Sequence, residues 1–264
     1  MTAKIGYTVG EPKEVTMARA RGYSPYETSP EQDALLDQIV AHAGSTGSAG
    51  VGVFDLDGCL FDTRPRQVHI MREFASQIGA LDLYAVTPES FKDWDLGNTL
   101  TNAGLPAERV AELVDDLKKF WFDRFFTSAY VRFDHAMPGA VDLVRRCRAT
   151  GMKIVYLTGR DETMRSGTEE ALRGFGFPLD GEECRLMVKP DFETDDTEFK
   201  DTALRIIAEM GKPTLFLDNE PANVNKFRDR YPESMVIFVE TDHSPRVDEP
   251  HPSLPWLRSF SRRG

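Results

Sequence analysis

The sequence has 264 residues, of which 41% are hydrophobic and 28% are charged, a balance typical of a globular chain with a substantial core. Its formal net charge of -11 argues against a protein that binds nucleic acid through general attraction to phosphates, because such proteins carry a basic surface. No apolar run reaches the roughly 18 residues that a membrane-spanning helix requires, and the first residues do not show the uninterrupted apolar core of a secretory signal. We therefore expect a cytoplasmic protein with reduced cysteines at Cys59, Cys147 and Cys184.

Residues 1–50 are expected to form an irregular arm, a short helix and a linker. Roughly the first thirty residues mix Gly, Pro, Thr and charges with little periodicity, which indicates an arm. A helix follows, with Ser29 as its N-cap, Pro30 in its first turn, and Leu36 and Ile39 on one apolar stripe. Residues 44–50 are rich in Gly and Ser and predict a flexible linker.

Short apolar segments alternate with helical segments through the rest of the chain. Strands are expected at residues 51–54, 152–157, 185–188, 213–217 and 235–239. Helices are expected at residues 139–150, 169–173 and 201–210. This alternation predicts an α/β fold in which a parallel sheet is covered by helices on both faces. Binding sites in such sheets lie at the carboxyl ends of the strands.

The segment 64–135 interrupts this alternation and predicts an α-helical cap inserted after the first strand. Apolar residues recur at helical spacing between Ala107 and Ser128. Its aromatic residues are expected to pack within the cap, or alternatively to stack on a substrate ring: Phe120, Trp121, Phe122, Phe125, Phe126, Tyr130 and Phe133. The resulting division is an amino-terminal segment (1–50), a catalytic core (51–63 and 136–245), a cap (64–135) and a carboxyl-terminal tail (246–264).

Two carboxylates follow the first predicted strand directly. Asp55 and Asp57 can reach one site if the chain turns after the strand, and Gly58 permits that turn. Such a pair suits phosphoryl transfer, in which one carboxylate attacks and the other handles the proton of the leaving group. Because a carboxylate approaches an anionic phosphate only with help from positive charge, the site requires cations.

These residues resemble the first motif of phosphatases of the haloacid dehalogenase (HAD) superfamily, which is Asp-Leu-Asp-Gly at residues 55–58 here. Later segments are similar to the remaining motifs and occur in the same order: Thr158 within Leu-Thr-Gly-Arg, then Lys200, then Asp218 within Leu-Asp-Asn-Glu. The resemblance covers about residues 51–63 and 138–239. It implies a Rossmann-like HAD core with a helical (C1-type) cap.

The resemblance also implies roles for the matching residues. Asp55 would attack phosphorus to form an aspartyl-phosphate, and Asp57 would protonate the departing alcohol and later deprotonate water. Thr158, Gly159 and Lys200 would bind the transferring phosphoryl group. In this superfamily, an acid two residues after the nucleophile marks phosphate chemistry rather than dehalogenation.

A Mg²⁺ ion would be held by the Asp55 carboxylate, the Asp57 backbone carbonyl and Asp218, which are oxygen ligands that this ion prefers. Glu220 is the candidate for a further ligand, with Asn219 or Asn223 acting through water as alternatives.

The sequence offers two lysines for the site, because Lys189 also follows a predicted strand. Lys200 is preferred for its position at a predicted helix start and its spacing before Asp218. Cys59 stands where the superfamily usually has Thr and is expected to contribute mainly backbone geometry.

Several basic residues lie near these motifs. Arg64, Arg66, His69 and Arg72 begin the predicted cap and are expected on a solvated helix face, although Arg64 is close enough to the first motif to bind a second anionic group of the substrate. Arg160 is expected either to reach the substrate or to pair with a nearby acid.

The function predicted from these residues is hydrolysis of a small phosphomonoester beneath a cap that shields the site from water. A nucleic-acid 3'-end phosphatase is an alternative, because residues 185–190 and Lys200 loosely resemble the phosphatase part of polynucleotide kinases, but the acidic charge argues against nucleic acid as a partner. A phosphomutase and a non-enzymatic binding protein on a HAD scaffold are further alternatives. The sequence leaves the substrate and the oligomeric state open.

Overall fold

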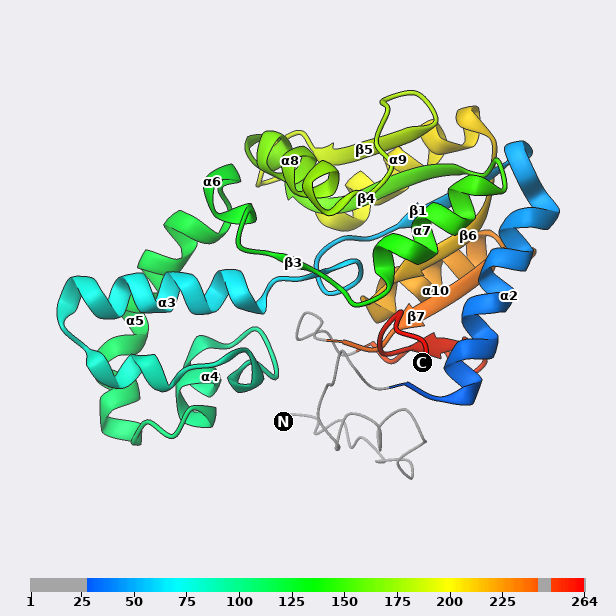
Figure 1. Ribbon diagram of the computed structural model, residues 1–264. Coiled ribbons are helices and arrows are strands. Elements are labelled where there is room, and N and C mark those ends of the chain that lie inside the picture. The colour runs from blue at the N-terminus through cyan, green and yellow to red at the C-terminus, as the bar shows by residue number, and fades with distance from the viewer. Residues whose placement is uncertain (1–27, 242–247, 264) are drawn as a thin grey trace, which may run out of the picture.

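The computed structural model describes residues 28–241 and 248–263, so most of the predicted arm lies outside the described residues. A parallel sheet with the strand order β5-β4-β1-β6-β7-β8 forms its centre (Figure 1). Its strands are β1 (Gly50–Phe54), β4 (Lys153–Asp161), β5 (Cys184–Lys189), β6 (Lys212–Asp218), β7 (Met235–Val239) and β8 (Trp256–Leu257). The predicted α/β fold is confirmed.

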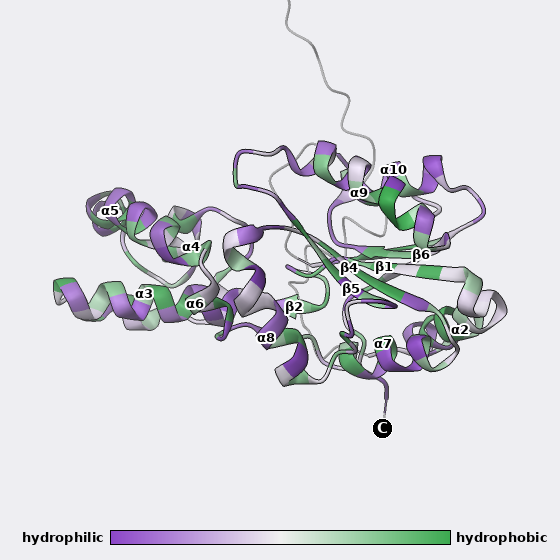
Figure 2. Cartoon of the chain, turned by 90° about the horizontal axis from the view of Figure 1, so that it is seen from above, coloured by the Kyte–Doolittle hydropathy of each residue, from purple (hydrophilic) through white to green (hydrophobic). Residues whose placement is uncertain are grey.

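Helices cover both faces of this sheet because the side chains of a strand alternate between the faces. Ile154 and Tyr156 of β4 pack with the cluster on one face, whereas Val155 and Leu157 pack with the cluster on the other. The first face carries α2 (Pro30–Thr46), α7 (Ala140–Ala149) and α8 (Arg165–Phe175), and the second carries α9 (Asp196–Met210) and α10 (Pro221–Arg230). Figure 2 shows the largely hydrophobic strands between these two layers.

A separate helical block extends from one end of the sheet (Figure 1). It has its own buried cluster, which includes Phe74, Leu100 and Leu117. The chain enters the block after β2 (Phe61–Asp62) and returns through β3 (His135–Ala136), and these two strands pair antiparallel. Its helices are α3 (Arg64–Ile78), α4 (Leu96–Asn102), α5 (Ala107–Phe125) and α6 (Ser128–Val131), with 3-10 turns at Leu81–Ala85 and Pro88–Ser90.

The predicted flexible linker at residues 44–50 is wrong. Helix α2 begins as expected, since the Ser29 hydroxyl accepts a hydrogen bond from the Gln32 N–H at 3.1 Å, but it continues to Thr46. A 3-10 turn, Gly47–Ala49, then leads directly into β1. At Gly50 an added Cβ would lie 2.4 Å from the Thr46 hydroxyl oxygen, so glycine here permits close packing rather than flexibility.

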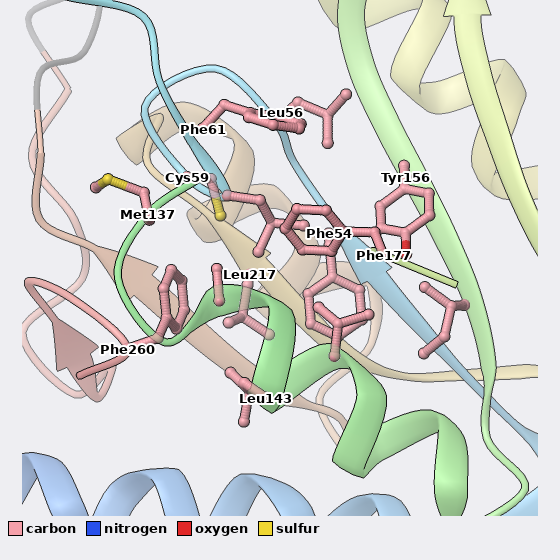
Figure 3. Close-up of a cluster of buried hydrophobic side chains, with 14 of the residues drawn as sticks. Phe54, Leu56, Cys59, Phe61, Met137, Leu143, Tyr156, Phe177, Leu217 and Phe260 are labelled. Carbon is pink, nitrogen blue, oxygen red and sulfur yellow. The ribbon is translucent and has the colours of Figure 1, made fainter. Parts of the chain in front are cut away.

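The predicted carboxyl-terminal tail contains a strand that sequence reasoning missed. Strand β8 pairs parallel with β7, and Phe260 beyond it is buried in the main cluster around Phe54 and Leu217 (Figure 3). A segment of two residues is too short to show the alternating pattern that identifies a strand. The same segment requires a glycine at residue 139, because a Cβ on that residue would lie 2.0 Å from the Phe260 carbonyl oxygen.

Helix α9 begins at Asp196 rather than at the predicted Asp201. The Asp195 carboxylate accepts a hydrogen bond from the Glu198 N–H at 3.0 Å, which is the contact of a helix N-cap. Lys200 consequently lies in the second turn of the helix. Among the helices of the described segments, none combines the length and the apolar character needed to cross a bilayer.

Candidate active site

The predicted catalytic residues meet at the carboxyl edge of the sheet. Asp55 follows β1, Thr158 lies near the end of β4, and Asp218 ends β6. Strands β4, β1 and β6 are neighbours, so their ends bring the motifs together. A cavity of about 320 Å³ opens there, and its lining includes seven of the predicted residues: Asp55, Asp57, Thr158, Gly159, Arg160, Lys200 and Glu220.

A tight turn presents the two aspartates after β1. The Asp55 N–H donates to the Leu217 carbonyl at 2.9 Å, which ties the end of β1 to β6. Gly58 has φ 76°, a left-handed conformation that favours glycine. The N–H of Cys59 donates to the Leu56 carbonyl at 3.0 Å, and the Cys59 side chain is fully buried. Burial raises the pKa of the Cys59 thiol, so this residue contributes to the turn and the core as a protonated thiol.

Lys200 bridges two buried carboxylates. Its Nζ donates to Asp55 Oδ1 at 2.9 Å and to Asp218 Oδ2 at 2.8 Å. Burial opposes the charge of Lys200, but Asp218 and Asp55 outweigh this effect and raise its pKa. Burial raises the pKa of Asp55 well above its usual value; Lys200 partly offsets that rise, and the Asp218 charge adds to it. Two buried carboxylates thus share one ammonium group at this site.

The alternative lysine lies elsewhere. Lys189 Nζ donates to the carbonyl oxygens of Phe192 and Thr194, at 3.2 and 3.0 Å, and lies 2.7 Å from Asp196 Oδ1. Lys189 thus holds the loop between β5 and α9, while the structure brings Lys200 to Asp55.

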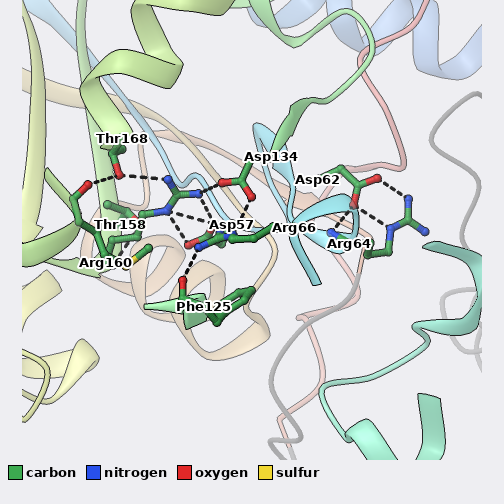
Figure 4. A network of polar contacts seen from close by, with 10 residues as sticks. Asp57, Asp62, Arg64, Arg66, Phe125, Asp134, Thr158, Arg160 and Thr168 are labelled. Atoms are coloured by element: carbon green, nitrogen blue, oxygen red, sulfur yellow. Dashed lines mark hydrogen bonds and ion pairs between the residues drawn. The ribbon is translucent and has the colours of Figure 1, made fainter. Parts of the chain in front are cut away.

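Two arginines hold the second carboxylate (Figure 4). Arg160 Nε donates to Asp57 Oδ2 at 3.0 Å, and Arg66 Nη2 donates to Asp57 Oδ1 at 3.3 Å. Burial works against ionisation of Asp57, but the Arg160 charge and hydrogen bonds, together with Arg66, outweigh it and hold the pKa of Asp57 below its usual value. Of the two roles expected for Arg160, the structure shows pairing with nearby acids, since Arg160 also donates to Asp134 at 2.6 Å.

The expectation of a solvated helix face at the start of the cap is wrong for its two first arginines. Arg66 is 0% exposed, and Arg64 is also buried, whereas His69 and Arg72 are exposed as expected. The helical pattern did not predict the burial of Arg66, because Asp134, the acid that compensates its charge, lies 68 residues away in the sequence.

Arg64 lies outside the cavity that contains Asp55. Its guanidinium forms two hydrogen bonds with the Asp62 carboxylate, at 2.8 and 2.7 Å, and it lines a smaller neighbouring pocket together with Gln67 and Thr241. The structure therefore does not bring Arg64 to the predicted phosphate site.

Apolar side chains also line the cavity. Trp94, Phe125, Phe126 and Met164 line it. The Phe125 ring lies 5.9 Å from Trp94 and 5.1 Å from Phe126, in edge-to-face contacts. Phe120 and Trp121 pack against the cluster of the helical block, as the first expectation has it. Stacking on a substrate ring stays a prediction for Phe125 and Phe126. Trp94 was not predicted, because it lies in a short polar segment without periodicity.

The carboxylate oxygens of Asp55 and Asp218, near Lys200, provide part of a binding site for a hard cation. Within residues 28–241 and 248–263, no group of three or more His, Cys, Asp and Glu side chains is placed to hold a metal. Asp55 and Asp218 nevertheless converge on one point, and Mg²⁺ is commonly held by one or two carboxylates while it keeps several waters. Asn223 Nδ2 donates to Asp218 Oδ2 at 3.0 Å, and the Glu220 N–H donates to Asp218 Oδ1 at 2.8 Å, so both residues orient this carboxylate.

Comparisons with known proteins give a partial sequence match and distant structural matches. Residues 113–212 match the family model described as HAD superfamily, subfamily IIIB (Acid phosphatase). This range contains Thr158 and Lys200, and it ends before Asp218. No curated protein matches the sequence.

Among solved structures, a putative phosphatase from Clostridium difficile is 14% identical, with a TM-score of 0.49, and the match covers 75% of this chain and 87% of that one. CbbY from Rhodobacter sphaeroides in complex with phosphate is 16% identical, with a TM-score of 0.46 and coverage of 80% and 94%. The class C acid phosphatase from Bacillus anthracis is 17% identical, with a TM-score of 0.44 and coverage of 85% and 83%.

The family match falls on the part of the chain that carries the second and third motifs, and the strand order brings those motifs to Asp55 and Asp218. Residues 113–212 thus match a HAD-superfamily acid phosphatase family, and the motifs on either side of this range resemble those of HAD phosphatases.

Proposed function

We propose that this chain is a Mg²⁺-dependent phosphomonoester hydrolase that acts on a small phosphorylated metabolite through an aspartyl-phosphate on Asp55. The observation that carries the proposal is the Asp55 carboxylate at the end of β1, 2.9 Å from Lys200 Nζ and in one cavity with Thr158 and Asp57. A nucleophile, a cation and a second carboxylate are the groups that this reaction requires.

In the first step, an Asp55 oxygen attacks phosphorus and the bond from phosphorus to the ester oxygen breaks. Asp57, which Arg160 and Arg66 hold ionised in the free chain, takes up a proton before this step and donates it to that oxygen, so the product leaves as an alcohol. In the second step, Asp57 takes a proton from a water molecule that attacks the aspartyl-phosphate, which releases inorganic phosphate and regenerates Asp55. Lys200 and Thr158 stabilise the charge of the phosphoryl group during both transfers.

Phosphatases of this superfamily generally use a divalent metal ion. In this chain the proposed ligands are Asp55, Asp218 and the backbone carbonyl of Asp57, with Glu220 as a further ligand or with Asn219 or Asn223 acting through water. When bound, Mg²⁺ would neutralise charge on the phosphoryl group. The two buried carboxylates that share the ammonium group of Lys200 support this assignment.

The lining of the cavity supports a small substrate over a nucleic-acid end. In the described part of the chain, Arg160 and Lys200 are the basic residues of the lining, and both are already paired with carboxylates. Asp196 and Glu220 add negative charge to the same lining, which disfavours a polyanion. The helical block supplies Phe125 and Phe126 to the cavity wall, and we propose that it serves as the cap of the site.

The test is phosphate release from p-nitrophenyl phosphate and from a panel of phosphorylated metabolites and 3'-phosphorylated oligonucleotides, with and without Mg²⁺. We expect metal-dependent turnover that favours small monoesters and that falls by roughly 10⁴-fold or more in Asp55→Asn, which lacks the nucleophile. Equal turnover by Asp55→Asn would refute the role of Asp55. A clear preference for oligonucleotide ends would replace the metabolite assignment.

A further inference from the structure

Three charged side chains link Asp57 to both connections between the helical block and the core (Figure 4). Arg66 lies in the first turn of α3, soon after β2, and Asp134 directly precedes β3. Arg160 belongs to β4 of the core. Asp57 and Arg160 line the cavity, whereas Arg66 and Asp134 lie behind them and are fully buried.

Arg160 is held at three points. Its Nε donates to Asp57 Oδ2 at 3.0 Å, its Nη1 donates to the Thr168 hydroxyl at 3.1 Å, and its Nη2 donates to Asp134 Oδ2 at 2.6 Å. A planar guanidinium fixed in this way has one orientation. Asp134 therefore helps to set the direction from which Arg160 holds Asp57.

Arg66 is also held at three points, and these connect the helical block to Asp57. Its Nε donates to Asp134 Oδ1 at 2.8 Å, its Nη1 donates to the Phe125 carbonyl at 2.8 Å, and its Nη2 reaches Asp57 Oδ1 at 3.3 Å. The guanidinium also lies 4.0 Å from the centre of the Phe125 ring, which lines the cavity. One side chain thus touches both the catalytic carboxylate and the apolar wall.

The network balances two carboxylates against two guanidiniums. Such balance is required because a single uncompensated charge at a buried site is strongly destabilising. A buried ion pair adds little stability compared with apolar side chains of similar volume, so stability alone does not account for Arg66 and Asp134. What the pair does provide is a fixed geometry around Asp57.

We propose that Arg66 and Asp134 are positioning residues that orient the Asp57 carboxylate toward the ester oxygen of the substrate. The inference rests on the proposed function, in which Asp57 protonates the departing alcohol. A general acid acts only within hydrogen-bonding distance of the atom it protonates, so its orientation controls the rate of that step. Arg66 and Asp134 lie at the two connections, so this control is located where the helical block joins the core.

The test compares two esters in the full chain. p-Nitrophenolate leaves without protonation, whereas the alkoxide of glycerol 2-phosphate requires a proton, so loss of Asp57 orientation should impair only the second substrate. The measured quantity is kcat/KM, because it covers the steps through cleavage of the ester and omits the later activation of water. The double variant Arg66→Met/Asp134→Leu removes one charge of each sign and so keeps the balance of the network.

We expect this variant to lose about 10²-fold in kcat/KM for glycerol 2-phosphate, the usual size of a general-acid effect, and less than about threefold for p-nitrophenyl phosphate. Its melting temperature reports on folding. If it fails to fold, Arg66→Lys keeps the charge but loses the planar fork, and the same selective loss is expected. A folded variant that loses both activities equally, or neither, would overturn the proposal.

Two controls separate this inference from the proposed function. Asp57→Asn should show the selective loss in full, and if it does not, the acid role of Asp57 fails whatever Arg66 does. The double variant Arg109→Met/Asp82→Leu removes an Arg–Asp pair of the helical block, with a distance of 2.7 Å, that lies outside the cavity lining. It should leave the ratio of the two activities unchanged.

Discussion

The two carboxylates that follow β1 have opposite electrostatic surroundings. Asp55 and Asp218 share the cation of Lys200, whereas Asp57 and Asp134 share the guanidiniums of Arg66 and Arg160. Burial accordingly raises the pKa of Asp55, while the pKa of Asp57 is lowered because Arg160 and Arg66 outweigh burial.

This difference separates two tasks within one cavity. On the Asp55 side, two buried carboxylates share one ammonium group, an arrangement that suits an added cation, and the side chains come from the sheet and α9 of the core. The Asp57 side is balanced in charge, and two of its four members come from the segments that join the helical block. Under the proposed function, the Asp55 side would bind metal and phosphate, and the Asp57 side would hold the carboxylate that transfers the proton.

Substitution of the two buried lysines, Lys200 and Lys189, is expected to give the largest effect on activity and tests the assignment of the Asp55 side. Lys200→Met removes the cation that contacts Asp55, so kcat/KM for p-nitrophenyl phosphate should fall by roughly 10²–10³-fold, as for other groups that stabilise transition-state charge. Lys189→Met is the matched control, because Lys189 is also buried but contacts loop carbonyls, and its effect on kcat/KM should be less than about threefold. The reverse order would assign the phosphate site to Lys189.

A smaller effect is expected on metal binding. Mg²⁺ at about 100 times its Kd should stabilise the folded chain by ~2.7 kcal/mol, which is measurable as a rise in melting temperature. Asp218→Asn should shift the Mg²⁺ concentration needed for this rise upward by at least about tenfold, since it removes a charged oxygen ligand. Asp229→Asn, on the exposed side of α10, should leave the titration unchanged. An unchanged titration in Asp218→Asn would remove this residue from the metal site.

The smallest effect is expected for thiol labelling of the three cysteines, including Cys59 in the turn that follows Asp57. Burial raises the pKa of Cys147 to about 12 and of Cys184 to about 11, and it also raises that of Cys59. Because a raised pKa leaves the thiol protonated at neutral pH and the thiolate is the reactive form, a thiol reagent should label the native chain slowly. Unfolding in denaturant should release all three thiols. Rapid labelling of Cys59 in the native state would show that the turn opens.

Much of the core was predictable because its signals are local. The apolar segment before Asp55 predicted β1, and the strand at 235–239 has the predicted bounds. Alternation of strands and helices predicted the parallel sheet, and a parallel sheet brings its carboxyl ends to one edge. For this reason, the motifs with Thr158 and Asp218 could be assigned to one site before the structure was known.

Other features could not be predicted because their partners are distant in the sequence. Gly50 belongs to a close contact between α2 and β1 rather than to a linker, and the strand β8 depends on its pairing with β7. The burial of Arg66 depends on Asp134, and a helical pattern does not report a partner beyond the helix.

The order of the motifs, the class of the fold and the residue types of the chemistry can be read from the amino-acid sequence, because strand, turn and cap preferences act over a few residues. The three-dimensional arrangement of the chain is needed to know which lysine meets Asp55, which arginines hold Asp57 and where Arg64 lies. Those choices follow from the sheet order and from the two connections of the helical block, which bring together side chains that are far apart along the chain.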